Sequence, residues 1–265
     1  MVGSVTSLFE PDGDSLVPTE LARGPWSPES LHGGPVAAAV ARSVEGITGE
    51  DGLALTRLTL DLVRPVSTAP ITVVSRVTRP GRKVQVVESV VTQSGVEVTW
   101  ARSLRIRVDP TLPSIAASTP EQPAPDGPAS GVEITSIVQG YPAFHNEGME
   151  IRFVGGRFDQ LGPSTAWFRL ACPVVAGETP TPVQRAVAAA DFGNGISAEL
   201  DFTTDTFINP DLTVSLIRPP VGEWVCLDAR TRFGSPGIGA AESVLWDEEG
   251  RIGRAVQNLF VESSR

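Results

Sequence analysis

The fold of this 265-residue chain is decided by the stretch Leu60-Asp61-Leu62-Val63-Arg64-Pro65, which returns in the second half as Val214-Ser215-Leu216-Ile217-Arg218-Pro219. A second segment, Val86-Val87-Glu88-Ser89-Val90, returns in the same order as Ala240-Ala241-Glu242-Ser243-Val244. The repeated unit is far longer than the roughly 20–50 residues of solenoid repeats. We therefore predict one small fold that is duplicated and fused.

Composition limits the partners of the chain. The net charge is -10 and the sequence pI is about 4.8, which disfavours nucleic acid and anionic membranes because these need a basic surface. Lys83 is the only lysine, so a bound anion would meet arginines or helix N-termini. Because we see neither a signal segment nor an apolar run long enough to cross a bilayer, we expect a cytoplasmic protein without a membrane span.

Cysteine and histidine are too sparse to indicate metal chemistry. The two cysteines lie in strand-like runs, where buried thiols are expected, and the two histidines are far apart. We predict no metal site and no cofactor.

The order of elements predicts an α+β fold. In the first copy an alanine-rich helix from Pro35 to about Glu45 precedes strands, which we expect at Thr59–Val63, Ile71–Thr78, Lys83–Gln93 and Val96–Arg107. The second copy begins with strands at Val132–Val138, Met149–Asp159 and Ala166–Pro173. A helix at Pro182–Asp191 follows, and then strands at Leu212–Leu216, Trp224–Phe233, Gly239–Trp246 and Arg251–Val261. A helix followed by antiparallel strands, found twice, is typical of two antiparallel sheets that each wrap a central helix.

A linker separates the two copies. Residues 111–130 are rich in Pro, Ala and Ser, with five prolines and no sustained apolar periodicity. We predict an N-terminal unit at 1–110, this linker, and a C-terminal unit at 131–265.

Four motifs of the second copy carry a family resemblance. They are Ala188-Ala189-Ala190-Asp191, Asn209-Pro210-Asp211-Leu212, Ile217-Arg218-Pro219 before Glu223-Trp224, and Ala255-Val256-Gln257. Together with Leu31-His32-Gly33-Gly34 in the first copy, they resemble the acyl-CoA thioesterase II (TesB-like) family. The resemblance implies a double hotdog fold, an acyl-CoA substrate, hydrolase activity and a place in fatty acid metabolism.

The resemblance also implies the site. In that family an Asp, a Thr or Asn, and a Gln hold the attacking water, and these positions fall on Asp191, Asn209 and Gln257. Near His32, the glycines Gly33 and Gly34 would let a substrate carbonyl approach backbone N–H donors at a helix N-terminus. We expect His32 to cap this helix or to line the pocket.

The repeat provides an internal comparison. Aligning Pro35 with Pro182 places Val44 opposite Asp191, and aligning the two Arg-Pro pairs places Leu55 opposite Asn209. Aligning Gly95 with Gly250 places Arg102 opposite Gln257. The polar groups are missing from the first copy, which predicts one composite site. The shared Arg-Pro and Glu-Ser pairs are interpreted as scaffold.

Two other functions stay open. A hotdog hydratase or dehydratase would act on enoyl- or hydroxyacyl-CoA through an Asp and a His around the α and β carbons. A non-catalytic acyl-CoA binding protein would keep the pocket without turnover. The sequence does not specify the acyl group, and monomeric and homo-oligomeric forms are both compatible with it.

Overall fold

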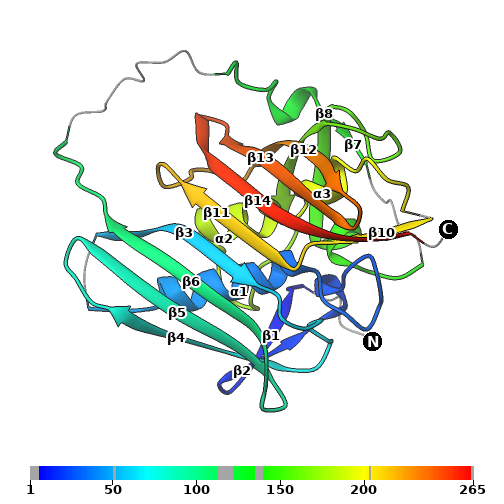
Figure 1. The fold of residues 1–265 in the computed structure, drawn as a ribbon. Coiled ribbons are helices and arrows are strands. Elements are labelled where there is room, and N and C mark those ends of the chain that lie inside the picture. The colour runs from blue at the N-terminus through cyan, green and yellow to red at the C-terminus, as the bar shows by residue number, and fades with distance from the viewer. Residues whose placement is uncertain (1–5, 50–51, 113–121, 135–139, 203, 264–265) are drawn as a thin grey trace.

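In the computed structural model, the described residues form one antiparallel sheet of 14 strands around two central helices (Figure 1). The structure describes residues 6–49, 52–112, 122–134, 140–202 and 204–263. Much of the predicted linker (113–121) and part of the strand predicted at Val132–Val138 (135–138) lie outside the described residues. The α+β double hotdog fold is confirmed.

The elements follow in chain order. The helices are α1 (Gly33–Glu45), α2 (Pro182–Ala190) and α3 (Gly193–Ile196), with short turns η1 (Glu20–Ala22), η2 (Pro128–Ser130) and η3 (Phe144–Gly148). The strands are β1 (Phe9–Asp12), β2 (Ser15–Pro18), β3 (Leu53–Asp61), β4 (Ile71–Arg79), β5 (Val84–Gln93), β6 (Val96–Arg107), β7 (Val132–Glu133), β8 (Met149–Gly155), β9 (Ser164–Leu170), β10 (Asp205–Ile208), β11 (Asp211–Leu216), β12 (Val225–Ser235), β13 (Ile238–Asp247) and β14 (Gly250–Ser263).

The two copies meet at the pair β3–β11 in the centre of the sheet. Thr59 lies opposite Thr213, and their hydroxyls are 3.2 Å apart at a sequence separation of 154. The same separation relates the last two strands of each copy. Glu88 pairs with Arg102 across β5 and β6, and the residues 154 positions later, Glu242 and Val256, pair across β13 and β14. Residues of β3 to β6 therefore have structural counterparts 154 positions later, except at the end of β4, where Arg79 pairs with Val86 but Phe233 pairs with Gly239.

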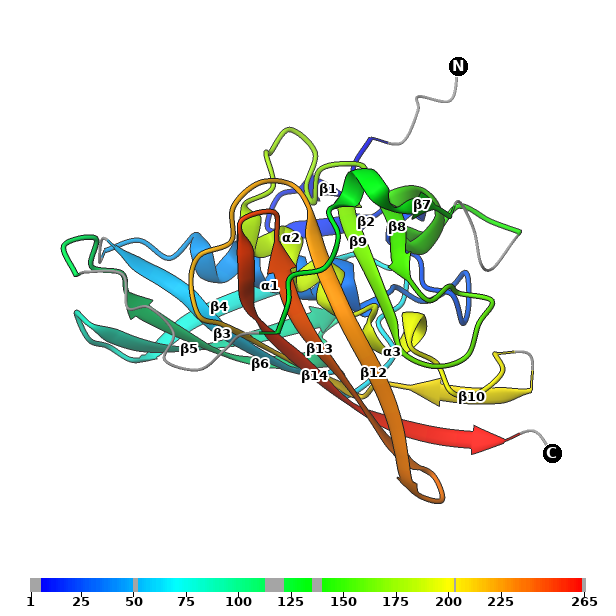
Figure 2. The same cartoon turned by 90° about the horizontal axis from the view of Figure 1, so that it is seen from above.

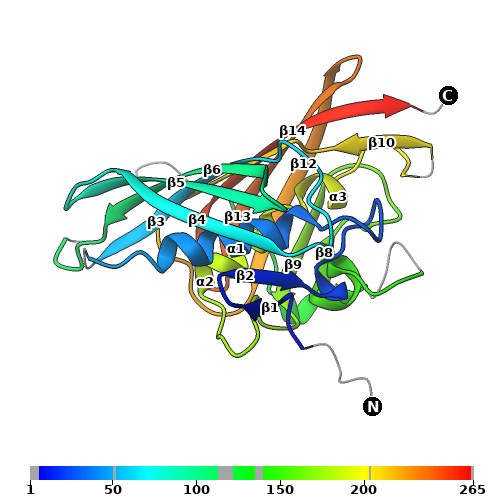
Figure 3. The same cartoon turned by 90° about the horizontal axis from the view of Figure 1, so that it is seen from below.

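The two longer helices pack against each other on the inner side of the sheet (Figures 2 and 3). Residues 36–41 of α1 are all buried, which is typical of a helix enclosed on every side. The helices run antiparallel, because Gly34 at the start of α1 contacts Ala188 near the end of α2, while Glu45 at the end of α1 contacts Thr181 before α2. Small alanine side chains allow this close approach. The start of α1 thus lies beside the end of α2, and the end of α1 lies beside the start of α2.

The N-terminal segment contains two strands that the sequence analysis did not predict. Strands β1 and β2 form a hairpin, with Gly13 in its turn at φ +58, and β2 extends the first sheet at β4. Leu8 and Phe9 donate backbone hydrogen bonds to Pro173 and Val174 of the second copy, at 2.9 and 3.0 Å. The division at 1–110 and 131–265 stays a prediction, with the chain start in contact with both copies.

No helix in the described part of the chain is long and apolar enough to cross a membrane.

Candidate active site

His32 lies at the junction of the two copies. It is the N-cap of α1, and its Nδ1 is 2.8 Å from Oδ2 of Asp191. Only 9% of its side chain is exposed, and its ring lies against Phe144 and Phe192, at centroid distances of 5.1 and 4.7 Å. The aromatic neighbours fix the imidazole in contact with the carboxylate.

Asp191 reaches this position because the two helices are antiparallel. It is the C-cap of α2 and is 95% buried, where the dipole of its own helix disfavours a negative charge. The N-terminus of α1 lies directly beside it and provides the opposite field. A Cβ at Gly33 would come within 2.7 Å of Oδ2, so glycine at this position makes room for the carboxylate.

Two amides complete the cluster. Asn209 follows β10 and donates from Nδ2 to Oδ1 of Asp191 at 2.8 Å. Gln257 on β14 donates from Nε2 to the same oxygen at 3.2 Å, and is 1% exposed. The structure therefore brings together the side chains of His32, Asp191, Asn209 and Gln257, which the sequence assigned to one composite site.

The remaining hydrogen-bonding capacity of the two amides differs. The Nε2 group of Gln257 also donates to the Asp191 carbonyl at 3.2 Å, and its Oε1 accepts from the Asn194 N–H at 3.0 Å. Asn209 uses Nδ2 for Asp191 and for the Asp211 carbonyl, which leaves its Oδ1 as an acceptor. Gln257 thus positions Asp191, whereas Asn209 retains an atom that can bind water.

The proton on His32 is determined by its two neighbours. Nδ1 lies 2.8 Å from Asp191 Oδ2 and 3.1 Å from the N–H of Gly34, and one nitrogen cannot donate to the first while accepting from the second. When Asp191 is ionised, Nδ1 must carry the proton, because two lone pairs at this distance repel each other. The Gly34 N–H points at Nδ1, and it becomes available to another acceptor only when Nδ1 carries the proton.

Gly34 is required by helix packing. A Cβ at this position would lie 2.5 Å from the carbonyl oxygen of Ala188 and 2.8 Å from a ring carbon of Phe144. The two glycines therefore serve different contacts: Gly33 accommodates the carboxylate and Gly34 accommodates the neighbouring helix.

Sequence reasoning missed the residues that support this cluster. A Cβ at Gly193 would lie 2.8 Å from Ser243 Oγ and 2.9 Å from Gln257 Oε1, so the turn after Asp191 needs glycine there. The next residue, Asn194, supplies the N–H that holds Gln257. The only signal in the sequence is the glycine-rich segment Phe192-Gly193-Asn194-Gly195, which directly follows Asp191.

The opposite ends of the helices form a second polar cluster with a different composition. Glu45 accepts from the Thr181 hydroxyl at 2.8 Å and from Gln184 Nε2 at 3.1 Å. Burial raises the pKa of Glu45, opposed by these hydrogen bonds and by Arg105. A carboxylate is thus present here, from Glu45 and not from the aligned Val44.

The structure also corrects one alignment of the two copies. Val87 faces Ser103 as Ala241 faces Gln257, so the counterpart of Gln257 is Ser103 and not Arg102. Gly95 lies within its turn, whereas Gly250 is the first residue of β14 and corresponds to Val96. With Leu55 opposite Asn209, neither site amide has an amide as its counterpart, and the amide that contacts Glu45 comes from Gln184 on α2.

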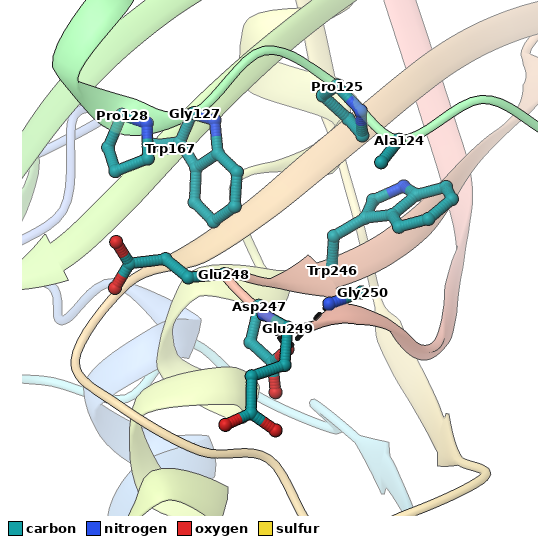
Figure 4. Close-up of a pocket in the computed structure, with 10 residues that line it drawn as sticks. All are labelled: Ala124, Pro125, Gly127, Pro128, Trp167, Trp246, Asp247, Glu248, Glu249 and Gly250. Atoms are coloured by element: carbon teal, nitrogen blue, oxygen red, sulfur yellow. Dashed lines mark hydrogen bonds between the residues drawn. The ribbon is translucent and has the colours of Figure 1, made fainter.

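Other parts of the described chain do not offer a comparable cluster. Within the described ranges, no group of three or more His, Cys, Asp or Glu side chains is arranged to hold a metal ion. A cavity of about 300 Å³ lies between the end of the linker and the strands of the second copy, lined by Trp167 and Trp246 and by the β13–β14 turn (Figure 4). Trp167 holds the linker there by donating to the Asp126 carbonyl at 2.7 Å. None of the proposed site residues lines this cavity.

Comparisons with known proteins agree with the fold. Residues 22–106 match the acyl-CoA thioesterase N-terminal domain family, and residues 113–261 match the acyl-CoA thioesterase C-terminal domain family. No protein of curated function matches the chain in sequence.

Several solved structures are similar in fold at low sequence identity. A hot dog fold protein of unknown function from Alicyclobacillus acidocaldarius has a TM-score of 0.73 and 16% identity, covering 96% of this chain and 95% of that one. The tesB protein of Mycobacterium avium subspecies paratuberculosis has a TM-score of 0.65 and 13% identity, covering 94% and 92%. An acyl-CoA thioesterase II from Mycobacterium marinum has a TM-score of 0.61 and 15% identity, covering 88% and 90%.

Proposed function

This chain belongs to the acyl-CoA thioesterase family, and from this premise we propose that it hydrolyses an acyl-CoA thioester to a free acid and coenzyme A. The observation that carries the proposal is the buried Asp191 carboxylate, which contacts both an imidazole and two amides. No metal or redox cofactor is part of this proposal. We also propose that the protein acts in fatty acid metabolism in the cytoplasm.

The hydrogen-bonding capacity of the cluster supports a specific role for each group. A water that donates one proton to Asp191 and the other to Asn209 Oδ1 directs an oxygen lone pair away from both. That oxygen attacks the thioester carbonyl carbon while Asp191 accepts a proton. The carbon–sulfur bond then breaks, and the proton passes to the departing CoA thiolate.

His32 and Gln257 are positioning residues in this mechanism. Both fix the Asp191 carboxylate, from opposite oxygens. Backbone N–H groups of Gly33 and Gly34 at the start of α1 would stabilise the oxyanion of the tetrahedral intermediate. The single-site prediction is supported by the repeat, in which Leu55 and Ser103 stand at the positions of Asn209 and Gln257.

A hydratase needs its acidic and basic groups on the two sides of the substrate. Here the Asp191 and His32 side chains are in direct contact at 2.8 Å, which leaves no space for a substrate between these atoms. This contact favours hydrolysis over hydration.

The test is to incubate the protein with acyl-CoAs of several chain lengths and to measure free thiol. We expect thiol release, and a loss of about 10²-fold or more in kcat for Asp191→Asn, which keeps the shape but removes the base. A matched control is Asp228→Asn, a half-buried carboxylate on β12 away from the cluster. Consumption of enoyl-CoA without thiol release would indicate hydration, and CoA binding without turnover would indicate a binding protein.

A further inference from the structure

Arg64 and Arg218 are counterparts in the repeat, but the structure gives them different surroundings. Arg218 forms an ion pair with Asp247 through two nitrogens, one of which lies 2.6 Å from Oδ2. The Asp247 side chain is fully buried and also accepts backbone N–H bonds from Val221 and Glu249. Arg218 is therefore part of the scaffold, as the sequence predicted.

The first copy has lost the partner of its arginine. Gln93 faces Val96 as Asp247 faces Gly250, so Gln93 is the counterpart of Asp247. Its neutral amide accepts from the Ser67 N–H at 2.9 Å and donates to the Ala69 carbonyl at 2.7 Å. Arg64 is exposed, and no ion pair to it is found among the described residues.

The turn that carries Arg64 connects both sides of the proposed active site. Leu62 donates a backbone hydrogen bond to the Pro210 carbonyl at 2.7 Å, next to Asn209. Two residues beyond Arg64, the Val66 carbonyl accepts from Leu31 at 2.7 Å, next to His32. Arg64 therefore belongs to the segment that hydrogen-bonds to the backbone next to His32 and next to Asn209.

We propose that Arg64 binds a phosphate group of the CoA moiety of the substrate, which rests on the proposed thioesterase function. Arginine matches the geometry of phosphate through paired N–H donors and stays charged at all working pH values. An unpaired arginine is significant in a chain of net charge -10, where an anionic substrate is otherwise repelled. The loss of the carboxylate partner in this copy alone leaves the charge free for the substrate.

The experiment compares two thioesters of the same acyl group, one on CoA and one on N-acetylcysteamine, which carries no phosphate. For Arg64→Ala we expect KM for acyl-CoA to rise about five- to tenfold with kcat nearly unchanged, a rise that shrinks at high salt. KM for the N-acetylcysteamine thioester should stay the same. Arg64→Lys should restore part of the affinity for acyl-CoA.

The matched control is Arg79→Ala, which removes the same charge from an exposed residue at the far end of β4. Arg79→Ala should leave KM unchanged for both acyl-CoA and the N-acetylcysteamine thioester. Arg64→Ala should keep the parental Tm, whereas Arg218→Ala should lower the Tm. An unchanged acyl-CoA KM in Arg64→Ala, or an equal rise for both thioesters, would overturn the proposal. If the parent protein hydrolyses neither thioester, calorimetric titration with CoA still decides: Arg64-dependent binding supports the phosphate site while the thioesterase function fails.

Discussion

Replacing Gly33 by alanine is expected to damage turnover far more than stability. The new Cβ would lie 2.7 Å from Oδ2 of Asp191 and 3.0 Å from Oδ1, whereas ordinary contacts begin near 3.4 Å. The carboxylate must therefore withdraw by about 0.7 Å, and a displacement near 1 Å can cost about 10²-fold in rate. We expect kcat/KM to fall about 10- to 100-fold.

The stability of this variant should change little. Moving the carboxylate lengthens its contacts with His32 and the two amides, but alanine at a helical position recovers up to about 1 kcal/mol relative to glycine. Urea unfolding should thus give a free energy within about 1 kcal/mol of the parent value. The kinetic measurement is thiol release from an acyl-CoA at several substrate concentrations.

Two other glycines serve as controls. At Gly34 the new Cβ would lie 2.5 Å from the backbone carbonyl of Ala188, which cannot move without separating the helices, so Gly34→Ala should lose about 2–3 kcal/mol of unfolding free energy. A Cβ added at Gly127 would have no non-neighbouring atom within 4 Å, so Gly127→Ala should change neither kcat/KM nor the free energy of unfolding. Parental kcat/KM in Gly33→Ala would refute the idea that the position of the Asp191 carboxylate controls turnover.

Three further outcomes are expected. Gln257→Leu removes the donor to Asp191, so kcat should fall at least tenfold with KM nearly unchanged, and a change in KM alone would contradict its positioning role. Because burial raises the pKa of Glu45 in the folded protein, the unfolded chain releases the Glu45 proton at a lower pH than the folded protein does. The parent should therefore lose stability relative to Glu45→Gln as pH rises above about 4.5. Urea unfolding midpoints of both proteins between about pH 4 and 8 measure this difference. A constant difference between these midpoints would show that Glu45 does not titrate in this way. Burial raises the pKa of Cys172 to about 12, so its thiol should stay unreactive toward a disulfide reagent at pH 7.5 until the chain unfolds; rapid labelling in the folded protein would contradict this.

Much of the fold was predictable because its signals are local. The β-rich runs and the two alanine-rich helices follow directly from periodicity and turn residues. The hairpin β1–β2 was missed because each strand has only four residues, and β1 itself contains Pro11 and Asp12, which are typical of turns.

The register of the two copies was predictable only in part. The Arg-Pro pairs align Leu55 with Asn209 correctly. Aligning Gly95 with Gly250 in the β5–β6 and β13–β14 hairpins, however, shifts the alignment of the two copies by one residue. Ser94 and Gly95 both have positive φ in a two-residue turn, whereas Gly250 stands one residue after the corresponding turn. A glycine reports a local backbone conformation and does not mark a fixed position in the ladder.

The sequence by itself determined that the fold is duplicated, that the second copy carries Asp191, Asn209 and Gln257, and that the first carries His32. Only the tertiary structure decided that these groups contact one another, that Gln257 is occupied in holding Asp191, and that Arg64 lacks the carboxylate that Arg218 retains. The physical reason is that propensity and periodicity act over a few neighbouring residues. The environment of Asp191, in contrast, arises where antiparallel helices bring the end of one copy against the start of the other.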